Sequence, residues 1–437
     1  MPDSAQGVWI SNGYGFQLVV GEDYLSAYHV TDAFCTVSRD TADELATLMD
    51  RFVLVDDGRL IVSSSLDSHS YYFERVDSLD PYCTNTAKTD AQTSFDAFAD
   101  LMSTHYAFFE LHGVDWDQRV ATARQRMKPD MTEQQLFDLM ASMLVGLEDA
   151  HLSLEAEIDG EPNSFKSDIG AVYAFARETA AVSGQSFDEV QQDLINQLWR
   201  EQVGQTTLQG QGVLVANNRI QYGMADAQIG YIGIVSMGGF ADEENLDPAS
   251  ELDVLKSSLD EAISHWRAND AKAVIVDVSF NHGGYDFVAN AIAKRFTDSS
   301  YHSYTRSPAD ASRPYETQYM TEPSSDPQFL GPIYMFTSDM TVSAGEVFVL
   351  AMKPLPNVTH VGERTRGAFS TILTKSLPNG WTLNMSNEIY RDHNGVVWEG
   401  QGVSPDKEIE VFVGTAPALG LKNALSEVIS IASASAN

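Results

Sequence analysis

Cysteines, basic side chains and long apolar runs are all scarce in this sequence of 437 residues. No apolar stretch approaches the roughly 18 residues that a membrane-spanning helix needs, so no integral membrane segment is expected. Lysine and arginine together number 27 against 62 acidic residues, which gives a formal net charge of -35. A surface of that sign repels the phosphates of nucleic acids, so we do not expect nucleic acid as a partner.

The two cysteines, Cys35 and Cys83, are the number that one disulfide needs. A disulfide is typical of an exported protein, whereas two free thiols would suit the cytosol. Residues 1–4 contain neither the basic region nor the apolar core of an export signal, so we expect any such signal to have been removed already. A periplasmic or extracellular location is the interpretation that joins these two features.

The length exceeds what one hydrophobic core usually serves, about 250 to 300 residues, so several domains are expected. Alternating apolar and polar positions between residues 7 and 83 predict a small antiparallel β domain, and the period then becomes helical. Beyond residue 225, strands alternate with helices. We therefore predict four regions: a β domain (1–90), a helical bundle (91–155), a helical linker or insertion (156–225) and an α/β domain (226–437).

Within the bundle, the pattern predicts helices over 95–109, 115–127 and 132–147, and Thr132 with Gln135 has the spacing of a capping box. In the last region it predicts strands over 229–235, 273–278 and 333–337 and helices over 252–268, 285–296 and 344–352. The polar stretch that carries Pro308, Pro314, Pro323 and Pro327 is predicted as a long loop. This alternation is typical of a mainly parallel sheet, whose sites lie beyond the carboxyl ends of its strands.

Three segments that follow predicted strands carry chemistry: 276–284, 337–346 and 362–367. Ser343 is expected at a strand-to-helix turn, where free N–H groups and the helix dipole favour a developing anion. Gly283 and Gly284 would let backbone N–H groups approach a substrate carbonyl, as an oxyanion hole requires. The residues alone leave an ordinary alternative, because Ser343 and Glu346 also fit a capping box.

Five motifs, in this order, resemble those of the tail-specific (C-terminal processing) and tricorn core serine peptidases. They are Leu-Glu-Asp-Ala-His at 147–151, Asn-His-Gly-Gly at 281–284, Thr-Val-Ser-Ala-Gly-Glu at 341–346, Gly-Glu-Arg-Thr-Arg-Gly at 362–367 and the segment 399–406. The resemblance covers about residues 94–412. It implies a crotonase-like core, a peptide or protein substrate, Ser343 as the nucleophile, and neither a cofactor nor a metal.

The resemblance also implies the base that a serine hydroxyl needs. Tail-specific peptidases place a lysine after the last glycine of the fourth motif, but Ala368 occupies that position here. Tricorn-type members use a histidine of the upstream motif, oriented through a network that includes a glutamate, and these positions match His151 and Glu399. The implied site is therefore Ser343, His151 and Glu399 with an oxyanion hole from Gly283 or Gly284 and Ala344.

Other interpretations stay open at the level of sequence. His282 is a rival base, His151 could be a solvated helix-end histidine, and Glu399 could be an exposed acid at a strand end. The chain could also be a binding module for apolar ligands, because the retinoid-binding repeats of the eye are similar to this family. No carboxylate-binding loop of a PDZ domain is visible between residues 152 and 225, so tail specificity is not predicted. The oligomeric state is left undetermined.

Overall fold

The computed structural model describes residues 5–31, 34–38, 49–56, 58–64, 70–84, 89–128, 130–167, 170–241, 248–412 and 417–436. The chain forms two compact units. Unit 1 comprises Met1–Asp168, Arg306–Thr317 and Ser370–Tyr390, and unit 2 comprises Ile169–Thr305, Gln318–Phe369 and Arg391–Asn437. Each unit is therefore built from segments that lie far apart in the sequence.

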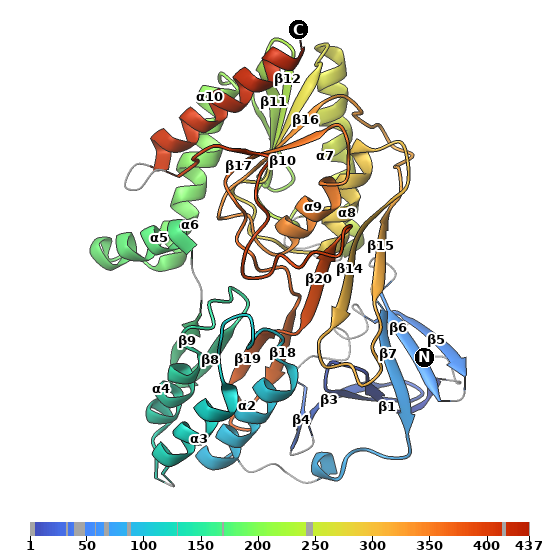
Figure 1. Cartoon of the computed structure of the whole chain (residues 1–437), viewed down its shortest axis with the longest axis vertical. Helices are drawn as coiled ribbons and strands as arrows, with labels where there is room; N and C mark the ends of the chain where they lie inside the picture. Colours follow the sequence, from blue (N-terminus) through green and yellow to red (C-terminus); the bar gives the residue numbers. More distant parts are fainter. Residues whose placement is uncertain are drawn as a thin grey trace. The chain divides into compact units, whose positions relative to one another are not determined.

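An antiparallel sheet of seven strands begins unit 1, in the order β4-β3-β2-β1-β7-β6-β5 (Figure 1). Its strands are β1 (Gly7–Ser11), β2 (Phe16–Val20), β3 (Leu25–Val30), β4 (Cys35–Val37), β5 (Arg51–Asp56), β6 (Arg59–Ser63) and β7 (Ser70–Val76). Trp9, Leu18 and Val62 are fully buried in its core. A disulfide joins Cys35 to Cys83 in the 3₁₀ helix η2 (Pro81–Thr84). Both the antiparallel sheet and the disulfide confirm the sequence prediction.

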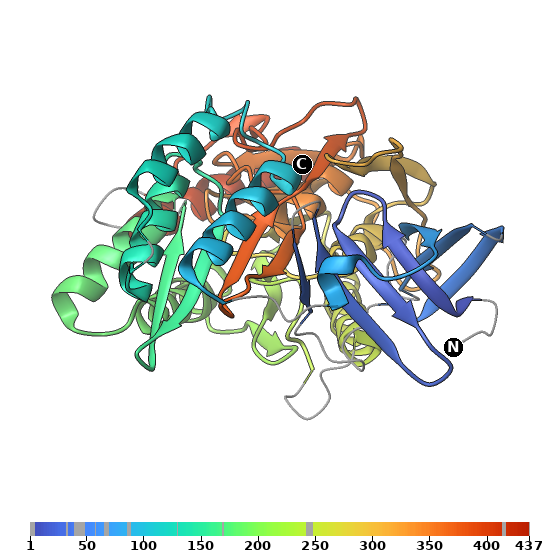
Figure 2. The ribbon, with the colours of Figure 1, turned by 90° about the horizontal axis from the view of Figure 1, so that it is seen from below.

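The rest of unit 1 is a helical bundle packed on a second antiparallel sheet. The helices are α2 (Ala91–His105), α3 (Trp116–Arg126) and α4 (Glu133–Leu144). The sheet has the order β18-β19-β8-β9, from β18 (Ile372–Ser376), β19 (Thr382–Ser386), β8 (Ser153–Ile158) and β9 (Glu161–Lys166). Figure 2 shows the late strands, in orange, beside the early helices, in cyan, and buried side chains of both share one core.

The predicted bundle is confirmed, with one correction to its first helix. Thr132 and Gln135 form the expected capping box at the start of α4. Helix α2 ends at His105 rather than at residue 109, because Tyr106 turns to an extended conformation (φ -71°, ψ 122°). The aromatic residues that follow fold back, and the rings of Tyr106 and Phe109 meet edge to face at 4.8 Å. Apolar spacing alone does not show where a helix stops when the next turn is equally apolar.

Unit 2 is built on a mainly parallel sheet with the order β10-β11-β12-β13-β16-β17-β21. In this sheet, strands β12, β13, β16, β17 and β21 run parallel to one another. Strands β10 and β11 at the other edge are antiparallel. The strands are β10 (Val213–Val215), β11 (Ile220–Asp226), β12 (Ile229–Ile234), β13 (Ala273–Asp277), β16 (Ile333–Thr337), β17 (Val358–Gly362) and β21 (Lys407–Glu408). This mixed α/β architecture confirms the predicted fold class.

Helices cover both faces of this sheet, as Figure 1 shows for α10 and α7. The π-helix η3 (Ile195–Thr207) and α10 (Pro417–Ala436) share one core with Tyr231, Ile275 and Phe336. The remaining helices are α5 (Gly170–Ser183), α6 (Phe187–Leu194), α7 (Pro248–Ala268), α8 (Asp286–Ala293), the 3₁₀ helix η4 (Lys294–Phe296) and α9 (Ala344–Met352). Across the described ranges, no helix is both long and apolar enough to span a bilayer.

The predicted long loop is wrong in part, because the stretch contains two strands. Residues Tyr301–Pro308 form β14, Thr317–Thr321 form β15, and both belong to a three-stranded sheet with β20 (Glu388–Asp392). The hydroxyls of Ser303 and Thr321 lie 2.5 Å apart, and the rings of Tyr304 and Tyr319 stack at 4.5 Å. Buried polar side chains that bond to one another across strands give no apolar alternation, so the sequence pattern missed them.

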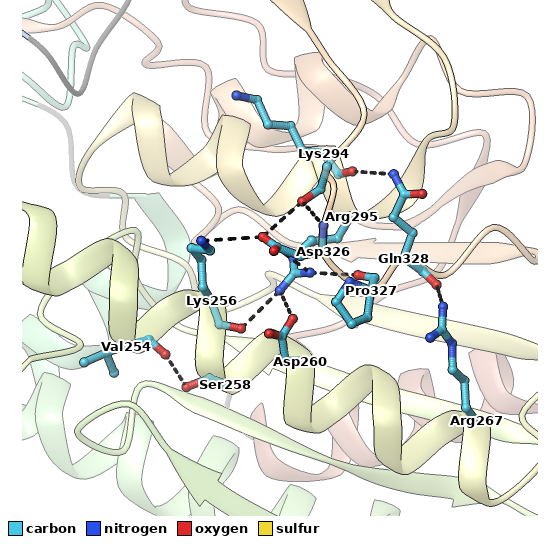
Figure 3. Close-up of polar contacts among 11 residues, drawn as sticks. Val254, Lys256, Ser258, Asp260, Arg267, Lys294, Arg295, Asp326, Pro327 and Gln328 are labelled. Atoms are coloured by element: carbon cyan, nitrogen blue, oxygen red, sulfur yellow. Dashed lines mark hydrogen bonds and ion pairs between the residues drawn. The ribbon is translucent and has the colours of Figure 1, made fainter.

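A buried arginine holds α7, η4 and the segment 326–328 together (Figure 3). Arg295 is 1% exposed, and its guanidinium donates to the carbonyls of Pro327 at 2.8 Å and Lys256 at 3.1 Å. It also bonds to the carboxylate of Asp260, and that of Asp326 lies 3.9 Å away. A structural arginine in this protein is thus met by carboxylates, as the cost of burying a charge requires.

Candidate active site

Three of the sequence motifs meet at one edge of the parallel sheet of unit 2. Strand β13 ends at Asp277, β16 at Thr337 and β17 at Gly362, and the three are parallel neighbours in the sheet. The carboxyl ends of parallel neighbours lie at the same edge, which is where α/β proteins bind ligands. The segments 278–284, 338–346 and 363–367 therefore emerge side by side, as predicted.

Ser343 stands at the turn into α9 in a strained backbone conformation. Its φ of 59° and ψ of -129° are rare for a residue with a side chain. Its side chain makes no capping hydrogen bond, so the interpretation as an ordinary helix cap is wrong. The backbone N–H of Ser343 donates instead to the carbonyl of Ala368 at 3.0 Å. A strained serine on a strand-to-helix turn is the local geometry of a nucleophile elbow.

Asn281 fixes the turn against the neighbouring strands. The side chain of Asn281 is fully buried, donates to the carbonyl of Ile234 at 2.9 Å and accepts the N–H of Gly283 at 3.0 Å. Its own carbonyl accepts the N–H of Val342 at 3.0 Å. A Cβ at Gly283 would lie 2.6 Å from the Cβ of Ser343, so only glycine fits there. Gly283 and Ser343 are therefore packed closely together.

Two backbone N–H groups near Ser343 are without a protein acceptor. Within the described part of the chain, the N–H groups of Gly284 and Ala344 donate to no other group. Ala344 is the first residue of α9, where N–H groups have no partner inside the helix and the dipole is positive. Gly283 differs, because Asn281 already takes its N–H. Free N–H pairs of this kind stabilise oxyanions in acyl transfer.

The carboxylate of Glu346 holds the loop that supports Ser343. Glu346 is fully buried and accepts the N–H groups of Gly367 at 2.6 Å and Ala368 at 2.7 Å. Ala368 in turn accepts the N–H of Ser343. Burial raises the pKa of Glu346 to about 7, against hydrogen bonds led by Thr365 that lower it. The sequence placed Glu346 in a capping box, and its support of the loop was missed because that contact is long-range.

Glu399 binds the next residue of the same loop. It is 4% exposed, and its Oε2 accepts the N–H of Phe369 at 3.0 Å. The N–H of Gly400 donates to the carbonyl of Gly367 at 2.7 Å. The alternative of an exposed strand-end acid is therefore wrong. Glu399 and Glu346 together hold three consecutive N–H groups beside the nucleophile turn.

His151 belongs to unit 1, where it follows α4 and precedes β8. It is 8% exposed, so the alternative of a solvated helix-end histidine is wrong. The backbone N–H of His151 donates to the carboxylate of Asp149 at 2.8 Å. Asp149 also accepts the hydroxyl of Ser386 at 3.1 Å. Its buried Nδ1 has no hydrogen-bond partner in the described chain. Burial lowers the pKa of His151 to about 4, which leaves a neutral imidazole at neutral pH.

Two protein-family models match the chain: peptidase family S41 matches residues 228–409, and the tricorn protease C1 domain matches residues 87–145. With these two matches the chain is identified as a serine peptidase, which confirms the resemblance to tail-specific and tricorn-type peptidases. The S41 match spans the three motifs at the sheet edge.

Solved structures share the fold of this serine peptidase. A protein of Parabacteroides merdae ATCC 43184 classed as a peptidase superposes with a TM-score of 0.61 at 23% identity, over 79% of this chain and 97% of that one. Mature CPAF complexed with lactacystin gives a TM-score of 0.53 at 14% identity, over 78% of this chain and 98% of that one. At these identities the similarity is one of fold.

Other candidate bases of this serine peptidase are engaged or differently placed. Lys375 is fully buried in unit 1, where its ammonium donates to the carbonyls of Tyr14 at 2.5 Å and Gly15 at 3.0 Å. Ala368 stands where tail-specific members have lysine, as the sequence indicated. His282 is half-buried in unit 2, and burial, followed by the charge of Arg219, lowers its pKa.

Replacing Glu346 by Gln should lower both kcat and the free energy of unfolding. An amide nitrogen cannot accept the second N–H, so one buried backbone N–H would lose its acceptor, at a cost of about 1–3 kcal/mol. The loop that bonds to Ser343 should then shift, and small displacements of reacting groups cost about 10²-fold in rate. We expect that loss in kcat on fluorescent casein.

Glu363→Gln is the matched control for Glu346→Gln. Glu363 also accepts two backbone N–H groups, of Val411 at 2.7 Å and Phe412 at 3.2 Å, but both bond to its Oε1 and lie outside the nucleophile turn. Because glutamine keeps that oxygen, Glu363→Gln should keep both bonds, and thermal denaturation should show little change in its stability; only Glu346→Gln should lose turnover. Equal kcat values for the two variants would show that Glu346 does not position the nucleophile.

Proposed function

We propose that Ser343 is the nucleophile that this peptidase uses to cleave peptide bonds. The observation that carries the proposal is its strained backbone at the start of α9, without a capping bond and beside two unused N–H groups. The hydroxyl oxygen would attack the scissile carbonyl, and the C–N bond would then break to leave an acyl-enzyme. The N–H groups of Gly284 and Ala344 would stabilise the oxyanion.

His151 is the proposed base, with Glu399 as the residue that orients it. The imidazole would take the proton of the Ser343 hydroxyl and pass it to the leaving amine, and a water molecule would release the acyl group by the same route. His151 lies in unit 1 and Ser343 in unit 2. Its low pKa supports the role of base, because the neutral form predominates at neutral pH.

We further propose that the protein acts on polypeptides in the periplasm or outside the cell. The Cys35–Cys83 disulfide supports this location, since disulfides persist in oxidising compartments. The acidic charge excess fits a highly soluble exported enzyme.

Covalent labelling tests the nucleophile without knowledge of the substrate. A fluorophosphonate should form an adduct on Ser343, located by mass mapping, because the hydroxyl is activated and faces N–H donors. Heat-denatured protein is the control and should not react. An adduct on another serine would displace the nucleophile. No adduct on folded protein, together with tight binding of an apolar ligand, would favour the non-catalytic alternative.

A further inference from the structure

Unit 2 contains a cavity of about 310 Å³, and the charged side chains that line it among the described residues are all basic. Arg200, Arg219 and His282 line it together with neutral side chains that include Val235. No aspartate or glutamate is among the described residues that form its wall. The chain as a whole has 62 acidic and 27 basic residues, so the charge of this lining is opposite to that of the chain. Its chemistry fits an anion.

The cavity lies at the same sheet edge as Ser343. Val235 directly follows β12 and His282 follows β13, the neighbouring parallel strand. His282 is also the residue before Gly283, which contacts the Ser343 side chain. Arg200 comes from η3, which is a π-helix, and such helices are rare and are frequently found at functional sites. His282 therefore links the wall of this cavity to the segment that approaches the nucleophile turn.

Among the described residues, the two guanidinium groups lack the carboxylate partners that Arg295 has. Among the described residues, the Arg219 side chain makes no hydrogen bond or ion pair. Arg200 donates only to neutral groups, the side chain of Asn196 and the carbonyl of Asn218 at 3.3 Å. Arg295, by contrast, is met by Asp260 and Asp326 (Figure 3). The cavity thus presents positive charge that the described fold leaves uncompensated.

The basic groups also act on one another. Burial, and then the charge of Arg219, lowers the pKa of Arg200, and the same two causes in the same order lower that of His282. The buried Nδ1 of His282 has no partner within the described chain. A bound anion would offset this repulsion and offer acceptors to all three side chains. The planar fork of a guanidinium matches a carboxylate in particular.

We propose that Arg200, Arg219 and His282 bind a carboxylate of the polypeptide substrate and so select the bond that is cleaved. The inference rests on the proposed function, because it assigns the cavity to the substrate of Ser343. The carboxylate has two possible sources, an aspartate or glutamate side chain or the carboxyl terminus of the substrate. Either source would place the scissile bond at a fixed number of residues from the carboxylate.

Digestion of a proteome-derived peptide library, with cleavage sites mapped by mass spectrometry, tests the proposal. The wild-type enzyme should cleave at a fixed distance from an acidic side chain or from the peptide end, and these two patterns distinguish the sources. Amidation of all carboxyl groups in the library should lower kcat/KM by about 10-fold or more, the value of a charged hydrogen bond. Arg219→Gln should show the same loss with the untreated library.

Arg267→Gln is the matched control, since Arg267 is exposed on α7 and the substitution changes the net charge equally. It should keep the wild-type pattern. An Arg219→Gln enzyme whose carboxylate dependence equals that of Arg267→Gln would overturn the proposal.

A binding measurement separates this proposal from that of the nucleophile. Immobilised full-length Ser343→Ala protein should capture carboxylate-bearing peptides from the library, and the Ser343→Ala, Arg219→Gln double variant should capture about 10-fold less. Equal capture by both proteins would overturn the carboxylate site whatever the nucleophile is. Cleavage by Ser343→Ala would instead refute Ser343, while the library pattern would still report on Arg219.

Discussion

The Ser343→Ala protein is expected to fold like the wild type and to lose about 10⁶-fold in kcat, the size of effect known for removal of a catalytic serine. The hydroxyl makes no capping bond, so its removal should change the free energy of unfolding by less than about 0.5 kcal/mol. Turnover of fluorescent casein and thermal denaturation measure the two effects. Retained turnover in this variant would exclude Ser343 as the nucleophile.

Ser258→Ala is the matched control for this loss. Ser258 lies on α7 in the same unit, and its hydroxyl donates at 2.8 Å to the carbonyl of Val254 in its own helix. Its removal should leave kcat unchanged. Ser343→Gly provides a second stability reading, because glycine adopts a φ of 59° without the strain of a Cβ. We expect the glycine variant to be more stable than the alanine variant by about 1–2 kcal/mol.

The His151→Ala protein is expected to lose several orders of magnitude, about 10³-fold or more, in fluorophosphonate labelling of Ser343. In the wild type, the labelling rate should rise with pH as the imidazole loses its proton. Because burial lowers the pKa of His151 to about 4, the rise should be centred near that value and the rate should be level at neutral pH. An ordinary histidine would give a midpoint near 6.5.

His265→Ala serves as the control for His151→Ala. His265 packs edge to face on Tyr222 at 5.8 Å, near the end of α7, and its removal should leave the labelling rate unchanged. A wild-type labelling rate in His151→Ala would mean that another group is the base. If His282→Ala then lost labelling, the base would be His282.

Much of the fold could be predicted because its signals are local. The alternation of short apolar runs with helical periods gave the strands that end at Asp277 and Thr337 and the helix that begins at Ala344. The capping box of Thr132 with Gln135 is also local, since the two residues are three apart. The strands β14 and β15 could not be predicted, because their buried hydroxyls and tyrosines satisfy one another only across the sheet.

The sequence by itself determined that chemistry gathers at one sheet edge, because parallel strands that alternate with helices bring their carboxyl ends together. Only the tertiary structure decided what Ser343 does locally. The sequence motif Ser-x-x-Glu is the same in a capping box and in this site. Here Glu346 reaches Gly367 and Ala368 instead, and the turn it supports holds Ser343 in a strained conformation. Such contacts join residues far apart in the chain, so no local pattern records them.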